Sequence, residues 1–160
     1  MIHYVKGNLL DSDCDYICHQ VNCQGVMRSG IAKQIRERWP EVFNAYVKTH
    51  EYHIKFGFPT EDMLGYVEPI HIDDGDRERY VVNMYSQHSY GYNAQRYTSY
   101  DAFACCLHQI RAFVPYGHTI GFPKNIGCGL GGGNWKVISA LIEEILGQDY
   151  DVYIYELEGA

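Results

Sequence analysis

Residues 121–135 read GFPKNIGCGLGGGNW, and they form the strongest local signal in the chain. A short apolar run ends at Pro123, glycines follow at positions 127, 129, 131, 132 and 133, and Asn134 is a residue type that caps helices. Because glycine adopts positive φ readily, successive N–H groups of such a loop can turn toward one anion, and the dipole of the next helix adds to the attraction. The stretch therefore predicts a strand, a cradle for phosphate or diphosphate, and a helix; a plain flexible connector is the alternative.

Two better-known phosphate motifs fit this loop less well. Gly127, Gly129 and Gly132 satisfy G-x-G-x-x-G, with Asp149 and Asp151 at about the offset of a ribose-binding acid. That fingerprint normally follows the first strand of its unit, whereas only one further strand is predicted here, so the match is weak. No Gly-Lys-Ser/Thr follows the loop, which excludes a Walker motif.

Outward from this loop, strand and helix patterns alternate along the whole chain. Helical spacing appears from Ile31 to Trp39, at 41–46, on the face of 100–110 and after Asn134; strands are predicted at 2–5, 15–21, 63–72, 79–85, 119–122 and 151–155, with a turn at 73–76. Such alternation predicts an α/β sheet sandwiched between helices. Ligands of these sheets bind at the carboxyl ends of strands, which directs attention to the loops after Val21 and Phe122.

The loop after Val21 carries polar groups suited to a sugar. Asn22 lies just past a strand, and its amide both donates and accepts hydrogen bonds, although a turn-stabilising role is equally consistent. His19 is a candidate for proton transfer, but a histidine at a strand end is more often structural. Gly30 precedes the next helix, so two glycine-opened helices beside an Asn predict a site for a phosphorylated sugar.

Composition limits the classes of protein. The 160 residues suffice for one domain, which we expect to span 1–160, and the net charge of -7 argues against a protein that coats nucleic acid. No apolar run approaches the ~20 residues of a membrane span, and the N-terminus alternates like a strand and not like a signal peptide. The six cysteines match no zinc spacing, so we expect reduced thiols in a cytoplasmic protein with no metal and no cofactor.

At its two loops the sequence resembles the macro domain family, which binds ADP-ribose. The resemblance covers nearly the whole chain and rests on YVKGNL (4–9), VNCQGVMRSGIA (21–32), PKNIGCGLGGGNW (123–135) and VYIYEL (152–157). It implies a three-layer α/β/α sandwich with a central mixed sheet. It also implies a monomer whose ligand is ADP-ribose or ADP-ribose 1″-phosphate, with no membrane partner and with nucleic acid as a partner only where it carries ADP-ribose.

The resemblance further implies which residues contact the ligand. Asn8 stands where the family has an Asp that contacts the adenine amino group, and Leu9 would offer its N–H. Asn22 matches the Asn that holds the distal ribose, and Gly30 and Ile31 match contacts to the diphosphate. The remaining matches surround the diphosphate, the distal ribose and the adenine: Ile126, Gly127, Cys128, Gly129, Leu130, Gly131 and Tyr155.

Two enzymatic branches of the family are closest in motif. Small phosphatases that act on ADP-ribose 1″-phosphate have a His-x-x-Asn-Cys-x-Gly pattern, which residues 19–25 fit. Hydrolases that free ADP-ribose from glutamate or DNA bases use a Lys beyond the middle strand, and the glutamate hydrolases also an Asp after Gly-Cys-Gly-Leu. Residues 82–87 (VNMYSQ) contain no Lys and Gly131 takes the Asp position, so we expect no covalent lysine intermediate.

The sequence thus leaves an enzyme and a binding module open. As an enzyme, the chain would hydrolyse ADP-ribose 1″-phosphate to ADP-ribose and phosphate, with Asn22 positioning the ribose and His19 transferring a proton. The alternatives are a non-catalytic ADP-ribose reader and a hydrolase of another ADP-ribosyl linkage that lacks the Lys/Asp pair. Residues 87–100, rich in Tyr and Gly, form either a flap over the distal ribose or a plain surface loop.

Overall fold

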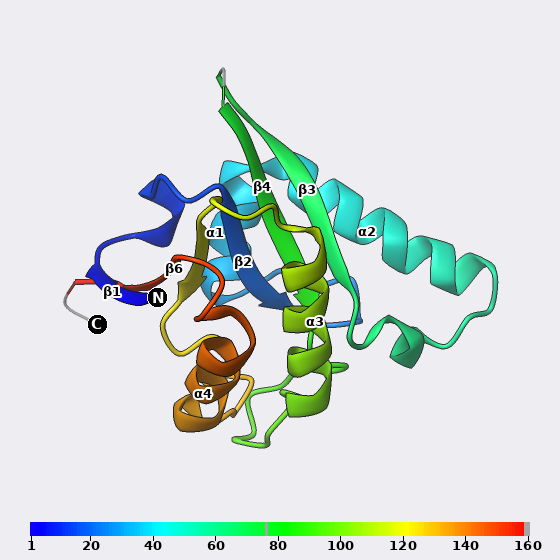
Figure 1. The fold of residues 1–160 in the computed structure, drawn as a ribbon. Helices are drawn as coiled ribbons and strands as arrows, with labels where there is room; N and C mark the ends of the chain where they lie inside the picture. The colour runs from blue at the N-terminus through cyan, green and yellow to red at the C-terminus, as the bar shows by residue number, and fades with distance from the viewer. Residues whose placement is uncertain (76, 159–160) are drawn as a thin grey trace.

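The computed structural model describes residues 1–75 and 77–158, and its centre is one six-stranded sheet (Figure 1). The strands run in the order β1-β6-β5-β2-β4-β3, and each neighbouring pair is parallel except β3 and β4. The sheet is therefore mixed, with one antiparallel edge strand. Its members are β1 (Ile2–Lys6), β2 (Tyr16–Val21), β3 (Val67–Asp74), β4 (Arg77–Tyr85), β5 (Ile120–Pro123) and β6 (Val152–Glu156).

Helices cover both faces of this sheet (Figure 1). α1 (Gly30–Arg38) and α2 (Pro40–Lys55) lie on one face, and α3 (Tyr100–Phe113) and α4 (Trp135–Leu146) lie on the other. Two short 3-10 helices, η1 (Leu9–Asp11) and η2 (Thr60–Met63), complete the elements. The predicted three-layer α/β/α sandwich is confirmed. None of the helices in the described part has the length and apolar character needed to cross a membrane.

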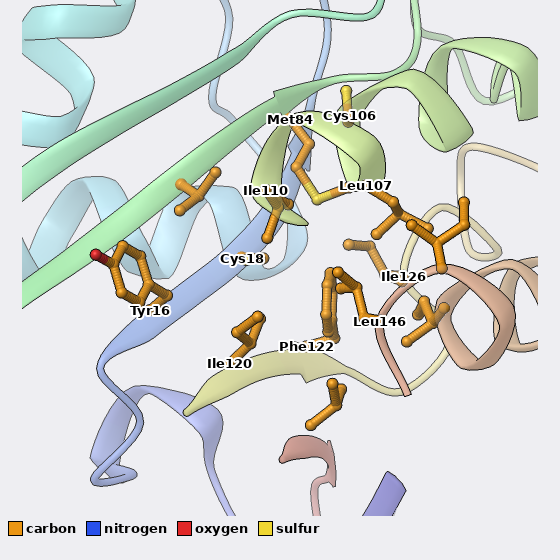
Figure 2. Close-up of a cluster of buried hydrophobic side chains, with 14 of the residues drawn as sticks. Tyr16, Cys18, Met84, Cys106, Leu107, Ile110, Ile120, Phe122, Ile126 and Leu146 are labelled. Atoms are coloured by element: carbon orange, nitrogen blue, oxygen red, sulfur yellow. The ribbon is translucent and has the colours of Figure 1, made fainter. Parts of the chain in front are cut away.

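Strand alternation divides the interior into two cores. In β2, Tyr16 and Cys18 face α3 and α4, while Ile17 and Val21 face α1 and α2. Figure 2 shows the first core, where Phe122 of β5 lies among side chains from both covering helices. Since each face buries its own apolar set, a one-residue slip of a central strand would exchange the two cores, and this fixes the register on which the strand ends depend.

The predicted cap of α4 is found, whereas two predicted element boundaries differ from those in the structure. Asn134 caps α4 by accepting a hydrogen bond from the Lys136 N–H. The helix predicted at 41–46 is α2, which runs on to Lys55; its second half buries no side chain fully, so apolar periodicity gave no signal there. The strand predicted from 63 begins at Val67, because 60–63 form η2. The predicted turn at 73–76 includes Asp76, which lies outside the described residues.

Candidate functional site

A cavity of about 600 Å³ opens at the carboxyl ends of the parallel strands. Its size is that of pockets that hold small-molecule ligands. Both loops singled out in the sequence contribute to its wall. The lining residues are 7–9, 20–22, 26–32, 34, 87, 90–92, 123–127, 129–131 and 155–157.

The strand order arranges these segments in a row. Residues 7–9 follow β1 and residues 155–157 close β6, so they lie together at one side; Gly7 is close enough to Tyr155 that a Cβ added there would be 3.8 Å from its ring. The glycine loop follows the central strand β5. Residues 20–22 and Gln87 end β2 and β4 on the other side. An extended ligand would thus meet Asn8 and Tyr155 first, the glycine loop in the middle, and Asn22 last.

The structure brings together most of the residues predicted for the site. Eleven of the thirteen predicted residues line the cavity, and His19 and Cys128 are the two that do not. Those that line it are Asn8, Leu9, Asn22, Gly30, Ile31, Ile126, Gly127, Gly129, Leu130, Gly131 and Tyr155.

The glycine loop is tightly coiled and leaves several N–H groups free. Gly127 has φ +72°, and a Cβ on Gly131 would lie 2.6 Å from Thr98 Oγ1 and 2.7 Å from the Gly127 carbonyl oxygen, so both positions require glycine. Within the described residues, the N–H groups of Gly127, Gly129, Leu130 and Gly131 have no hydrogen-bond partner. These donors, gathered over a few residues that line the cavity, form a nest suited to an anion.

The helix dipole at the cavity comes from α1 and not from α4. The N–H groups of Gly30, Ile31 and Ala32 begin α1, line the cavity and have no partner in the described part of the chain, and Ser29 makes no side-chain cap. No residue of α4 lines the cavity, so the expected contribution of the helix after the glycine loop is not found. Two sets of unpartnered N–H groups, from α1 and the glycine loop, therefore line one space.

Asn22 is held by its own loop more completely than the sequence suggested. Its Oδ1 accepts hydrogen bonds from the Gln24 N–H at 2.9 Å and from the Tyr46 hydroxyl at 2.7 Å, and its Nδ2 donates to the Val26 carbonyl at 2.9 Å. An amide has two acceptor positions and two N–H donors. Asn22 is therefore left with one free N–H, so it can donate to a ligand but has little capacity left to accept.

His19 belongs to β2, the strand that ends at the cavity, but its side chain lies in the interior. Its side chain is fully buried, its Nε2 lies 2.5 Å from Asn83 Oδ1, and its Nδ1 has no partner within the described residues. Burial lowers the pKa of His19 to about 4, so the ring is neutral at pH 7. Gln20, the next residue of β2, points to the other face and lines the cavity instead.

Cys128 turns its side chain away from the ligand space. Its Sγ lies 3.4 Å from the Ile126 carbonyl oxygen and packs beside the core under α3 and α4, while its N–H donates to the Asn125 carbonyl. Burial raises the pKa of the Cys128 thiol. Its part in the site is to close a turn of the glycine loop.

Charged groups gather at the β1–β6 side of the cavity. Glu156 Oε2 lies 2.9 Å from Lys6 Nζ and 3.2 Å from Lys124 Nζ, and these two ammonium groups hold the pKa of the Glu156 carboxyl below its usual value. Arg28 also lines the cavity and is exposed, with no ion-pair partner in the described part of the chain. The described residues contain no group of His, Cys, Asp or Glu side chains placed to hold a metal ion.

Sequence reasoning missed a polar hub beneath the glycine loop. Gln20 Nε2 donates to Gln87 Oε1 at 2.7 Å and to Thr98 Oγ1 at 2.9 Å, and Thr98 Oγ1 donates to the Gly127 carbonyl at 2.7 Å. The position of Gln20 and Gln87 at the carboxyl ends of two adjacent strands was the available signal. From the loop that follows β4, Tyr90 and Tyr92 also line the cavity, so this segment does border the ligand space.

Several known proteins are similar to this chain in sequence and fold. A DNA ADP-ribosyl glycohydrolase of Thermus aquaticus is 26% identical over 161 residues, which cover 98% of this chain. The chain spans 41% of the length of that relative, and 14% of the length of the mycobacterial proteins of the same name. No protein-family model matches the chain.

Solved structures extend the comparison. The macrodomain of Mycobacterium tuberculosis DarG superposes with a TM-score of 0.76 and is 28% identical, with 97% of each chain covered. Thermosipho africanus DarTG in complex with ADP-ribose superposes with a TM-score of 0.73 over 96% of this chain and 41% of that one; at 18% identity, this likeness concerns the fold alone. In its mixed sheet and in the order of its elements, the chain is therefore similar to macrodomains of solved structure.

Proposed function

We propose that this chain binds ADP-ribose in the cavity and hydrolyses a bond at the distal ribose of an ADP-ribose derivative. The single observation that carries the proposal is the placement of two sets of unpartnered N–H groups, from Gly30–Ile31 and from the glycine loop, on the wall of one cavity. Backbone donors and a helix N-terminus suit a diphosphate, and their place in the middle of the row leaves room for a nucleoside on one side and a sugar on the other.

The two ends of the row of lining segments differ in chemistry, as a ligand with a nucleoside at one end and a sugar at the other requires. Tyr155 offers an aromatic ring and Asn8 a polar edge at the β1–β6 side, as a purine requires. At the β2–β4 side, Asn22 presents one N–H toward an oxygen acceptor such as a sugar hydroxyl. The resemblance to the family assigns adenine and distal ribose in this same order.

The β2–β4 end of the cavity, where the reaction would take place, has no general base among its described lining residues, and this shapes the mechanism we propose. The described cavity residues at the β2–β4 side are Gln20, Asn22, Gln87, Tyr90 and Tyr92, and they include no carboxylate, imidazole or amine. In the proposed hydrolysis of ADP-ribose 1″-phosphate, a water oxygen bonds to phosphorus and the bond between phosphorus and the ribose oxygen breaks. One proton of the water stays on the phosphate, and the other passes by way of a phosphate oxygen to the leaving ribose oxygen, which becomes the hydroxyl of ADP-ribose. The loop N–H groups stabilise the negative charge, and His19 supports the strand without touching the substrate.

ADP-ribosylated DNA is a second candidate substrate. It is favoured by the relatives named DNA ADP-ribosyl glycohydrolase. Against it stands the stretch 82–87, which contains no Lys although that branch of the family uses one in this region. A reader that binds ADP-ribose without turnover is the third outcome, and it is consistent with the absence of a base among the lining residues named above.

One set of measurements separates these outcomes. Calorimetry with ADP-ribose measures binding, phosphate release measures attack on ADP-ribose 1″-phosphate, and chromatography of free ADP-ribose measures its removal from an ADP-ribosylated oligonucleotide. We expect binding, and turnover of the first substrate that falls at least tenfold in Asn22→Ala. Absence of binding at millimolar ADP-ribose would refute the proposal; binding without any product would leave a reader.

A further inference from the structure

A buried tyrosine of α2 makes three close polar contacts to the loop that carries Asn22. Tyr46 is fully buried, and its hydroxyl oxygen lies 2.7 Å from Asn22 Oδ1, 2.7 Å from the Asn22 carbonyl oxygen and 3.1 Å from the Val26 nitrogen. A hydroxyl has one proton to donate and two acceptor positions. The Val26 N–H therefore fills an acceptor position, and the proton of Tyr46 is shared between the two oxygens of Asn22.

These contacts determine which way the Asn22 amide points. Because Tyr46 and the Gln24 N–H both bond to Oδ1, that atom must face α2 and the loop, and Nδ2 must lie on the opposite side. One of its hydrogens bonds to the Val26 carbonyl, and the second is the group left for the cavity. If the Tyr46 hydroxyl were absent, the amide would lose one of the three hydrogen bonds that fix this orientation, and only those to the Gln24 N–H and the Val26 carbonyl would hold it.

The side chain of His50, one turn further along α2, contacts the same loop at Gly25. Gly25 has φ +75°, and a Cβ there would lie 2.9 Å from His50 Nδ1, so the loop backbone rests against the ring of His50. Tyr46 and His50 are four residues apart and lie on one face of the helix. The helix therefore fixes the loop at two points.

We propose that Tyr46 is a positioning residue for the ligand site: its hydroxyl orients the Asn22 amide so that an N–H, and not an oxygen, faces the distal sugar. The inference rests on the proposed function, in which Asn22 contacts that sugar. Tyr46 lies 24 residues from Asn22 and is not among the residues that line the cavity. It acts on the ligand indirectly, through its bonds to Asn22 and Val26, which both line the cavity.

Tyr85 supplies a matched control. It is a tyrosine of nearly the same burial, its ring centroid lies 5.8 Å from that of Tyr46, and its hydroxyl bonds to Glu68 Oε1 at 3.2 Å and not to the Asn22 loop. Tyr46→Phe and Tyr85→Phe each remove one buried hydroxyl from the same cluster. They differ in whether the lost hydrogen bond reaches Asn22.

The test compares ADP-ribose affinity, measured by calorimetry, in the wild type and in both variants. We expect Tyr46→Phe to weaken binding about tenfold, the scale of one net hydrogen bond, and Tyr85→Phe to stay within about twofold of wild type. A loss below twofold in Tyr46→Phe, or equal losses in both variants, would overturn the inference. Lack of binding by the wild type itself would instead refute the proposed function.

A measurement without ligand decides the positioning role separately. In the ligand-free protein, NMR hydrogen exchange at the Val26 amide reports the bond to the Tyr46 hydroxyl directly. We expect exchange at Val26 to be about tenfold faster in Tyr46→Phe and unchanged in Tyr85→Phe. If Tyr46→Phe does not fold, protection of Val26 in the wild type still tests the contact, and an unprotected Val26 amide would contradict it.

Discussion

At the scale of single residues, Asn8 uses one of the two acceptor positions of its oxygen internally. Its Oδ1 accepts a hydrogen bond from the Leu10 N–H at 3.0 Å, so one acceptor position and the NH₂ group remain. If adenine lies here, as the resemblance implies, its amino group would meet a neutral oxygen that already accepts one hydrogen bond. We expect Asn8→Asp to keep the cap on Leu10 and to tighten ADP-ribose binding about tenfold, because the second carboxylate oxygen can accept from the amino group. Calorimetry checks this, with Asn8→Ala as control; weaker binding by the aspartate variant would contradict it.

His19 makes a separate residue-scale prediction about stability. Its pKa is about 4 in the folded protein and about 6.5 when unfolded, so the unfolded state binds the extra proton first as pH falls. The stability that the neutral ring contributes is complete above pH 6.5 and is lost toward pH 4, by about 3 kcal/mol. We expect the free energy of unfolding, measured with urea, to fall less between pH 7 and pH 4.5 in His19→Gln than in the wild type. Replacement of the exposed His108 by Gln should leave this fall as large as in the wild type. An equally large fall in His19→Gln and in the wild type would contradict the burial argument.

At the scale of elements, the glycine loop contains two kinds of glycine. Gly129 has no atom within 4 Å of an added Cβ and no positive φ, and it lines the cavity, whereas a Cβ on Gly131 meets Thr98 Oγ1 at 2.6 Å. We expect Gly129→Val to leave the thermal unfolding midpoint nearly unchanged and to weaken ADP-ribose binding at least tenfold, because the side chain would occupy the anion site. Gly131→Ala should lower the midpoint by several degrees, because the loop must shift. Wild-type affinity in Gly129→Val, measured by calorimetry, would place the anion elsewhere.

The same loop shows where sequence reasoning stops at the element scale. Local chemistry predicted its glycines, the Asn134 cap and the apolar stripe of α4, because each depends on neighbours a few residues away. The sequence predicted two helix N-termini at the ligand, and only that of α1 lines the cavity, because this depends on how α1 and α4 lie over the sheet. In the hub of Gln20, Gln87 and Thr98, Gln20 bonds to one residue that lies 67 positions further along the chain and to another that lies 78 positions further. No local pattern indicates such contacts.

At the scale of the whole molecule, the alternation of strands and helices was enough to predict the three layers. It was not enough to predict the order of the strands in the sheet. The order β1-β6-β5-β2-β4-β3 arises from pairings between the two ends of the chain, such as Tyr4 with Ile154. It is this order that places Asn8, the glycine loop and Asn22 in a row. The polar residues of the site were visible in the sequence, but their arrangement along one cavity depends on long-range pairing.

That arrangement predicts how ligand fragments should behave. If one ligand spans the row, its two halves joined by a diphosphate should stabilise the fold far more than the separate halves, because linkage removes the entropic cost of binding a second piece. At 100 times its dissociation constant, ADP-ribose should add about 2.7 kcal/mol and raise the unfolding midpoint by about 5–10 °C. At the same concentration, an equimolar mixture of AMP and ribose 5-phosphate should give less than a third of that shift in a thermal unfolding assay. An equal shift with the mixture would mean that the two sides of the cavity bind independently and that the N–H groups in the middle do not hold a shared diphosphate.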